Sequence, residues 1–155
     1  MKNHTFTLHL AWQVPDVSPI SPRDPSLRRH TISHPDKPAI SGSAAQAFHG
    51  EVERWNPEEL LLASLAQCHM LTFFYLANQE GIVIADYTDT PEAILETHPD
   101  GSGNITTVLL KPTVTIREGW TGNIEALHKR AHDLCFIARS VNFPVRHDAT
   151  IVTIT

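Results

Sequence analysis

The chain has little cysteine and no strong excess of positive charge. Its 155 residues include only two cysteines, Cys68 and Cys135, too few for the disulfide framework of a small secreted protein. The formal net charge is −5 at pH 7 and no basic run offsets it, which argues against binding to nucleic acid or to anionic membranes. The two cysteines are therefore expected to form a redox pair or to occupy unpaired places in the core.

A targeting segment, internal repeats and low-complexity tracts are also missing. The first 14 residues alternate polar and apolar side chains, whereas a secretory signal has an unbroken apolar run, so we expect a cytoplasmic protein. With 41% hydrophobic residues, a chain of this length has enough material for one core. Residues 1–155 are therefore expected to form a single domain.

Residues 56–81 predict one long helix. Asn56 offers the side-chain acceptor of an N-cap, Pro57 suits the first helical position and Glu59 completes a capping box. Residues 60–77 are apolar on almost every face, and Gly81 suits the end of the helix. Such a helix is expected to be buried all round, with Cys68 near its middle.

This helix also approaches the roughly 20 apolar residues that are needed to cross a bilayer. Its centre contains Gln67, His69 and Thr72, and its flanks carry no charge bias. Both features favour a buried core helix over a membrane span, so we expect no membrane segment.

The rest of the chain predicts short strands and a second helix. Strands are expected at residues 5–14, 28–33, 39–43, 82–86, 93–97, 105–116 and 145–154. Prolines predict a long loop at 15–26, and the composition of 98–104 predicts a turn. Apolar residues at helical spacing predict a helix from Thr121 or Asn123 to about Arg139, with Cys135 facing inward. The order indicates an α+β fold in which two helices pack against antiparallel sheet.

Three other chemistries use overlapping residues. His128, His132 and Cys135 lie on one helical face and could bind zinc, with Cys68 and His69 as possible further ligands. Cys68, His132 and Asp133 could instead serve a cysteine hydrolase. A third alternative is a non-enzymatic protein whose apolar pocket binds a fatty ligand.

Two segments resemble the OsmC and Ohr family of thiol-dependent peroxidases, which reduce organic hydroperoxides. NPEELLLASLAQCHM, residues 56–70, is similar to the family's run from Asn/Asp-Pro-Glu to its reactive cysteine. LHKRAHDLCFIARSV, residues 127–141, resembles the segment that holds its second cysteine. The resemblance covers most of the chain from Leu27 onward and points to an OsmC-like branch.

The resemblance implies a fold and a mechanism. The fold is an antiparallel β-sheet wrapped around two central helices in an intertwined homodimer. Cys68 attacks the peroxide, and Cys135 resolves the sulfenic acid that forms. A buried thiolate needs a cation, and the family pairs it with an arginine held by a glutamate, which here is Glu58. For the arginine, Arg28 is the first choice and Arg23 and Arg29 are alternatives.

Further expectations concern the partners and the second cysteine. Ten helical residues span about 15 Å, so the Glu58 beside Cys68 is expected to belong to a partner chain. A dithiol reductant such as a lipoylated protein is expected, with no metal or organic cofactor. Ohr proteins commonly have proline after the second cysteine, where this chain has Phe136, so the helix is expected to continue through Cys135. Apolar side chains expected to line the peroxide pocket are Phe73, Phe74 and Phe136.

Overall fold

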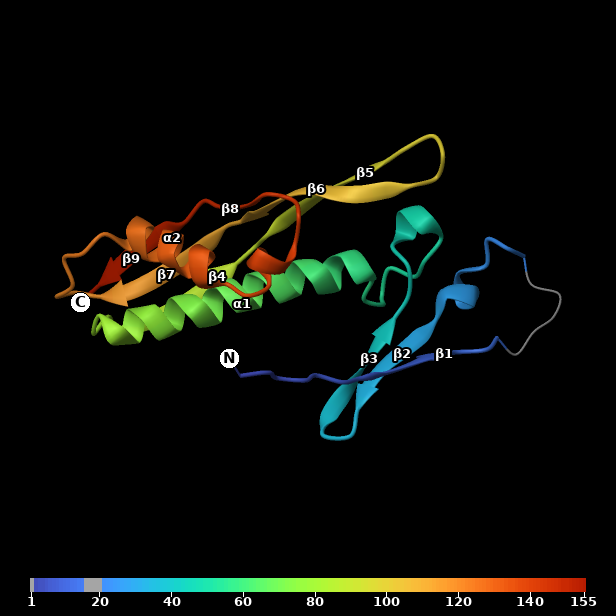
Figure 1. The fold of residues 1–155 in the computed structure, drawn as a ribbon, viewed down its shortest axis with the longest axis horizontal. Coiled ribbons are helices and arrows are strands. Elements are labelled where there is room, and N and C mark those ends of the chain that lie inside the picture. The colour runs from blue at the N-terminus through green and yellow to red at the C-terminus, as the bar shows by residue number, and fades with distance from the viewer. Residues whose placement is uncertain (1, 16–20) are drawn as a thin grey trace. The chain divides into compact units, whose positions relative to one another are not determined.

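A computed structural model describes residues 2–15 and 21–155 (Figure 1). The chain divides into two compact units, Met1–Leu60 and Leu61–Thr155, which are described in turn. Both contain strands, and two α-helices complete an α+β fold, as predicted.

The first unit is built around a three-stranded antiparallel sheet of order β1-β2-β3. Its strands are β1 (His9–Trp12), β2 (His30–His34) and β3 (Lys37–Gly42). All three were predicted, but β1 is shorter than the expected 5–14. His9 pairs with Ser33, next to the β2–β3 hairpin turn, so the residues before His9 extend past the strand and have no ladder partner there.

The proline-rich loop lies partly outside the described residues, at 16–20. Its described end forms a short 3₁₀ helix, Pro25–Arg28, in which Asp24 accepts a hydrogen bond from the Ser26 N–H at 2.9 Å. A second 3₁₀ turn, Gln46–Phe48, follows β3.

Helix α1 (Pro57–Gln79) begins and ends where the sequence predicts. The Glu59 N–H donates to Asn56 Oδ1 at 2.8 Å, and the Asn56 N–H donates to Glu59 Oε2 at 3.3 Å, so the capping box forms. Beyond the C-terminal end, Gly81 has a φ of 70°, which suits a residue without a Cβ.

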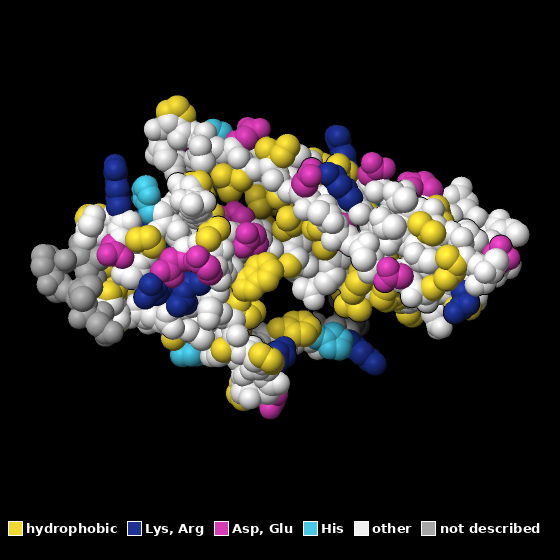
Figure 2. Space-filling model, turned by 180° about the vertical axis from the view of Figure 1, so that it is seen from behind, with side chains coloured by type: hydrophobic (Ala, Val, Ile, Leu, Met, Phe, Trp, Pro, Cys, Tyr) yellow, Lys and Arg dark blue, Asp and Glu magenta, His cyan; other side chains and the backbone are white. Residues whose placement is uncertain are grey.

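The expectation that α1 is buried all round is wrong for a single chain. Leu71 and Tyr75 are 58% and 62% exposed, because the sheets and α2 cover only one side of the helix. Apolar side chains also reach the surface at many places between the charged ones (Figure 2). By length and composition α1 could span a membrane, since 18 consecutive residues of it have a mean hydropathy of 1.6. The core helix of a soluble protein can be equally long and apolar.

Two three-stranded sheets form the second unit, with orders β4-β7-β9 and β5-β6-β8. The strands are β4 (Ile84–Asp89), β5 (Glu92–Thr97), β6 (Gly103–Leu110), β7 (Pro112–Arg117), β8 (Val145–His147) and β9 (Thr150–Ile154). β5 and β6 extend as a long hairpin (Figure 1). The predicted turn at 98–104 connects them, and the Ser102 N–H donates to Asp100 Oδ1 at 2.9 Å.

Two expected strands are each broken in the middle. The stretch 105–116 divides at Lys111, whose N–H donates to Asp89 Oδ1 at 2.8 Å, and Pro112 then cannot donate to a ladder. The stretch 145–154 divides where the Asp148 N–H donates to the Leu110 carbonyl at 2.9 Å. At this shared bend the chain passes from one sheet to the other.

The two sheets of the second unit are mixed, which corrects the antiparallel expectation there. β8 pairs with β6, and β9 with β7, in parallel. Parallel neighbours need a crossover connection, and the segment containing α2 (Ile124–Leu134) supplies it.

Helix α2 starts at the predicted cap, where the Ala126 N–H donates to Asn123 Oδ1 at 3.1 Å. It ends at Leu134 and not at Arg139, and Cys135 has an extended backbone. The helix therefore does not continue through Cys135, although no proline follows. Cys135 Sγ instead accepts a hydrogen bond from the Ala138 N–H at 3.5 Å, within a tight turn that leads to the 3₁₀ helix Ala138–Ser140.

The buried core of the second unit lies where α1, α2 and the sheets meet. One cluster joins the C-terminal half of α1 to β7 and α2, through Phe73, Leu76, Ala77, Ile82, Val114, Ile116, Ile124, Leu127 and Ala131. A smaller one joins the N-terminal half of α1 to β6 and β8, through Leu65, Val108, Leu110 and Val145. Both helices are thus held by packing, and each brings its cysteine toward this core.

Candidate functional site

The two cysteines lie on neighbouring elements of the second unit. Cys68 is half-buried in the middle of α1, and Cys135 is 1% exposed at the end of α2. Both are free thiols and are not at disulfide distance. They nevertheless interact, because the Cys68 thiol adds to the rise in the pKa of Cys135. The structure therefore brings these two sequence-predicted residues together.

Their environments differ in a way that bears on redox chemistry. Burial raises the pKa of the Cys135 thiol to about 11; the hydrogen bond from the Ala138 N–H acts against this shift, and Cys68 adds to it by a smaller amount. Cys135 is therefore protonated at neutral pH. Cys68 is the less buried of the two residues, so it is the one more open to a small molecule from solvent.

The expected aromatic lining does not form as one surface. Phe73 is fully buried, with its ring centroid 4.3 Å from that of His128, while Phe136 is 79% exposed. Phe74 instead faces an open pocket of about 450 Å³ between α1 and β4. The other residues lining that pocket are Met70, Ile84, Ala85, Asp86 and Tyr87.

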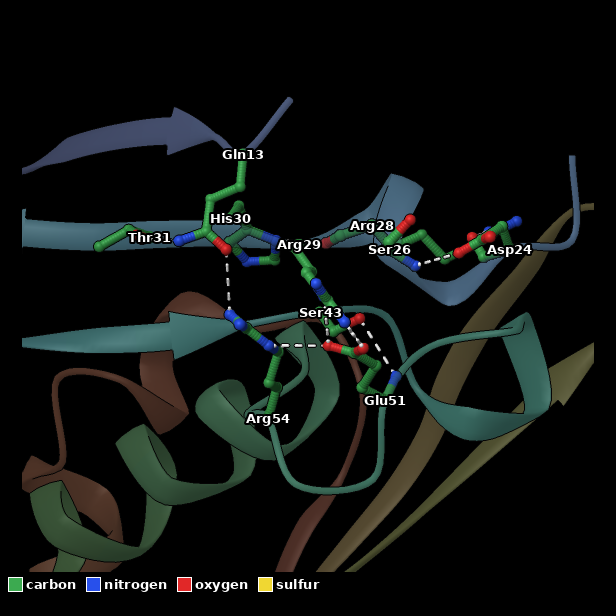
Figure 3. A network of polar contacts seen from close by, with 10 residues as sticks. All are labelled: Gln13, Asp24, Ser26, Arg28, Arg29, His30, Thr31, Ser43, Glu51 and Arg54. Atoms are coloured by element: carbon green, nitrogen blue, oxygen red, sulfur yellow. Dashed lines mark hydrogen bonds and ion pairs between the residues drawn. The ribbon is translucent and has the colours of Figure 1, made fainter. Parts of the chain in front are cut away.

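In the first unit, a polar network engages one arginine with a carboxylate. Arg29 is bidentate to Glu51, with contacts of 2.6 to 3.0 Å, and Arg54 Nε lies 2.8 Å from the same carboxylate. Figure 3 shows both guanidinium groups directed at Glu51. Hydrogen bonds from Arg29 hold the pKa of Glu51 below its ordinary value. The Arg29 charge is thus already compensated within this unit.

The first-choice arginine is held differently. Arg28 donates to the carbonyl oxygens of Asp24 and Pro22 at 3.1 and 3.2 Å, and it has no ion pair with any of the residues described. Arg23 is exposed. Glu58, in the first turn of α1, has a buried Oε2 with no hydrogen-bond partner in residues 2–15 and 21–155. Among the described residues, neither Arg28 nor Glu58 forms an ion pair.

A buried histidine cluster was missed by sequence reasoning. His69 on α1 and His128 on α2 are 1% and 0% exposed, and their Nε2 and Nδ1 atoms share a hydrogen bond of 3.0 Å. His147 on β8 completes the cluster, and the three ring centroids lie 5.3 to 5.8 Å apart. The available signal was the position of both buried histidines inside apolar helical stripes, where a polar ring must find a partner.

Burial keeps this pair uncharged. It lowers the pKa of His69 to about 3 and that of His128 to about 4, and repulsion from the neighbouring imidazoles adds to both shifts. The other titratable groups near the pair are His132, His147 and Glu125. Glu125 Oε1 lies 3.6 Å from His147 Nδ1. His69 Nδ1 and His128 Nε2 have no hydrogen-bond partner within the described part of the chain.

The zinc and hydrolase alternatives are not supported by this geometry. Among the described residues, no group of three or more His, Cys, Asp or Glu side chains is arranged to hold a metal ion. His128 is bonded to His69, and the chain turns away from the helical path at Cys135. Asp133 is paired with Lys129 at 3.1 Å on the exposed side of α2, so it does not orient a catalytic histidine.

Comparisons with known proteins agree with this fold. The family profile described as OsmC-like protein matches residues 49–150. The chain is similar to the structure of an OsmC-like protein of unknown function from Vibrio cholerae, with 27% identity, a TM-score of 0.82, and coverage of 92% of this chain and 97% of that one. No curated protein matches the sequence.

Two further structures are named for peroxide resistance. An organic hydroperoxide resistance protein OsmC from Legionella pneumophila is 20% identical with a TM-score of 0.66, and one from Elizabethkingia anophelis is 14% identical with a TM-score of 0.68. Each comparison covers 97% of this chain and 99% of the other. At these identities they show a shared fold.

The neutral histidine pair predicts a loss of stability in acid. The unfolded chain takes up protons below about pH 6.5, whereas folded His128 resists protonation down to about pH 4. The contribution of neutral His128 to the free energy of unfolding is therefore fully present above about pH 6.5. It decreases as the pH drops, by about 3 kcal/mol at pH 4. Urea denaturation at several pH values between 7 and 4 measures the slope of the free energy of unfolding against pH.

His128→Asn, which does not titrate, should show a shallower slope. His98→Asn, at an exposed position, should keep the wild-type slope. Equal slopes in all three proteins would contradict the assignment of acid sensitivity to the buried pair.

Proposed function

Because the OsmC-like profile matches residues 49–150, the chain belongs to the OsmC-like family, and we propose that it is a thiol-dependent peroxidase that reduces organic hydroperoxides. The family and the neighbours named for organic hydroperoxide resistance suggest a role in peroxide resistance. The observation that carries the proposal is the arrangement of the chain's only two cysteines, the half-buried Cys68 on α1 and the buried Cys135 at the end of α2, on two helices that pack against each other.

In the first step, Cys68 acts as the nucleophile. Its thiolate attacks one peroxide oxygen, the O–O bond breaks, and the alkoxide leaves and takes up a proton to give an alcohol. The sulfur is oxidised to sulfenic acid as the peroxide is reduced. The half-buried position of Cys68 supports this role, because a hydroperoxide must reach the reacting sulfur.

In the second step, Cys135 resolves the sulfenic acid. It loses its proton, its sulfur attacks Cys68 Sγ, an S–S bond forms, and the released hydroxide takes up a proton to give water. The raised pKa of Cys135 keeps this thiol protonated until then, which makes it a poor first nucleophile. A dithiol, such as the dihydrolipoyl group of a lipoylated partner protein, then reduces the disulfide and is itself oxidised to a cyclic disulfide.

Arg28 is the proposed cation for the Cys68 thiolate. A guanidinium both favours a thiolate and polarises a peroxide oxygen. Arg28 supports the role better than Arg29, because its side chain meets only neutral carbonyls while Arg29 is engaged by Glu51. Glu58, with its unpartnered buried oxygen, is the proposed carboxylate that orients the Arg28 fork.

A second copy of the chain is part of the proposal, which places a homodimer in the cytoplasm. Glu58 and Cys68 are ten residues apart on one continuous helix, or about 15 Å along its axis, so they do not meet within that helix. The exposed apolar side of α1, with Leu71 and Tyr75, supports cover by a partner. A partner α1 lying antiparallel alongside would bring its Glu58 near Cys68.

One observation favours a binding protein for an apolar ligand as the second candidate. The pocket between α1 and β4 combines Met70 and Phe74 with a single carboxylate, Asp86. It does not include either cysteine, so this candidate assigns no role to the thiol pair.

Substitution of each cysteine tests the peroxidase. Cys68→Ser should abolish consumption of cumene hydroperoxide, because the serine hydroxyl is not ionised at neutral pH. Cys135→Ser should react once and then accumulate sulfenic or sulfinic acid at Cys68. Peroxide assays and intact mass spectrometry measure both results, with the disulfide of the wild type after one equivalent of peroxide as the reference. Undiminished turnover by Cys68→Ser would rule the mechanism out.

Substitution of the two adjacent arginines tests the cation. Arg28→Met should slow the reaction of Cys68 with peroxide on the order of 100-fold, the cost of removing one preorganised donor. Arg29→Met is the matched control, expected to lower stability through loss of the Glu51 pair while the reaction rate stays near that of the wild type. Stopped-flow measurements with limiting peroxide give the rate. The opposite ranking would transfer the role to Arg29.

Subunit mixing tests the shared site. Glu58→Ala and Cys68→Ser proteins are each expected to be inactive as homodimers. After random exchange of chains, one site in four combines an intact Cys68 with an intact Glu58, so about a quarter of wild-type activity should return. Peroxide consumption before and after exchange is the measurement. A fully active monomer, or mixtures no more active than their parents, would show a site assembled within one chain.

A further inference from the structure

We infer that the buried His69–His128 hydrogen bond is a clamp that fixes α1 against α2 while the turn after α2 moves to bring Cys135 to Cys68. This inference rests on the proposed peroxidase function and makes both histidines positioning residues for the second step.

The histidine pair is placed to control the spacing of the two helices that bear the thiols. His69 directly follows Cys68 on α1, and His128 lies seven residues, two helical turns, before Cys135. The 3.0 Å hydrogen bond joins the helices in the dry core, where it is stronger than in water. Phe73, one turn after His69 on α1, stacks on the His128 ring and prevents it from swinging away.

Closure of the disulfide requires movement, because the free thiols are not at disulfide distance. The helices themselves are poor candidates for this movement. Sliding α2 along α1 would break the buried hydrogen bond and disturb the packing of Leu127 and Ala131 against Phe73 and Leu76.

The turn after α2 is held less firmly than the helices, because Ile137 and Ala138 are only partly buried where they pack against the Leu65 cluster. Its polar contacts are mostly internal to it: the Arg139 N–H donates to the Cys135 carbonyl at 3.1 Å, and the Ser140 hydroxyl donates to the Phe136 carbonyl at 2.8 Å. Phe136 is exposed, so moving it disrupts little packing. Loss of the weak contact from Ala138 to Cys135 Sγ releases the sulfur. Movement of this turn, while the two helices stay fixed, therefore brings Cys135 Sγ within bonding distance of Cys68 Sγ.

Replacement of His69 separates this role from simple packing. His69→Met fills a similar volume and removes the hydrogen bond, whereas His69→Gln places an amide near the position of Nε2 and can restore it. Ile124→Val, which trims the same core one helical turn before His128 and leaves the hydrogen-bonded pair intact, is the control for lost stability. Each protein is mixed with one equivalent of cumene hydroperoxide. Dimedone trapping follows the sulfenic acid and mass spectrometry follows the disulfide.

In His69→Met, sulfenic acid should still form at Cys68, but the disulfide should close about 10- to 100-fold more slowly, the cost of a small misplacement of reacting groups. His69→Gln and Ile124→Val should close at rates near that of the wild type. Closure by His69→Met at the wild-type rate, or a His69→Gln as slow as His69→Met, would overturn the clamp. A wild type that forms neither sulfenic acid at Cys68 nor the Cys68–Cys135 disulfide would instead refute the proposed function.

A measurement on the wild type covers the case in which His69→Met does not fold. Nitrogen-15 spectra of the imidazoles in the dithiol and disulfide forms should show unchanged signals for His69 and His128. The backbone amides of residues 136–140 should shift. Imidazole signals that move on oxidation as much as those amides would overturn the inference.

Discussion

The apolar surface of α1 is the constraint on which the rest of the structure depends. One side of the helix packs against the strands and α2, with Leu65, Phe73 and Leu76 in the core. Leu71 and Tyr75 remain at the surface of a single chain. Burial of apolar side chains stabilises a protein by about 25 cal/mol per Å², so the exposed side is a strong driving force for association. The same burial creates the dry surroundings that raise the pKa of Cys135.

The chemistry follows from where the polar groups lie within this core. A helix with no polar residue among its buried positions would pack as well, but α1 carries His69 on its buried side and Cys68 next to it. His69 needs a partner because an unsatisfied imidazole costs free energy in the core, and His128 on α2 is that partner. One polar contact thus specifies which part of α2 lies against the middle of α1.

Local signals in the sequence were sufficient for much of the fold. The capping box at Asn56 and Glu59 and the stop at Gly81 located α1, because caps depend on neighbouring residues. Alternation located the strands to within a few residues, and the two cysteine segments brought Cys68 and Cys135 together. Features that depend on distant residues were missed. The engagement of Arg29 by Glu51 and the histidine pair are fixed by contacts that no local pattern reveals. The end of α2 at Leu134 was missed for another reason, because the turn that ends it is held by contacts to the Cys135 sulfur and carbonyl that are not a usual helix stop.

The bend shared by the two sheets has a consequence for synthesis of the protein. β6 and β7 are the central strands of their sheets, and each receives its second neighbour only from β8 or β9 at the end of the chain. Until β8 and β9 have left the ribosome, β6 and β7 are both open edges able to pair with another nascent chain. A chain that stalls before β8 lacks one strand of each sheet. Synthesis of β8 and β9, and not the early formation of α1, therefore sets the moment at which these two edges are protected from aggregation.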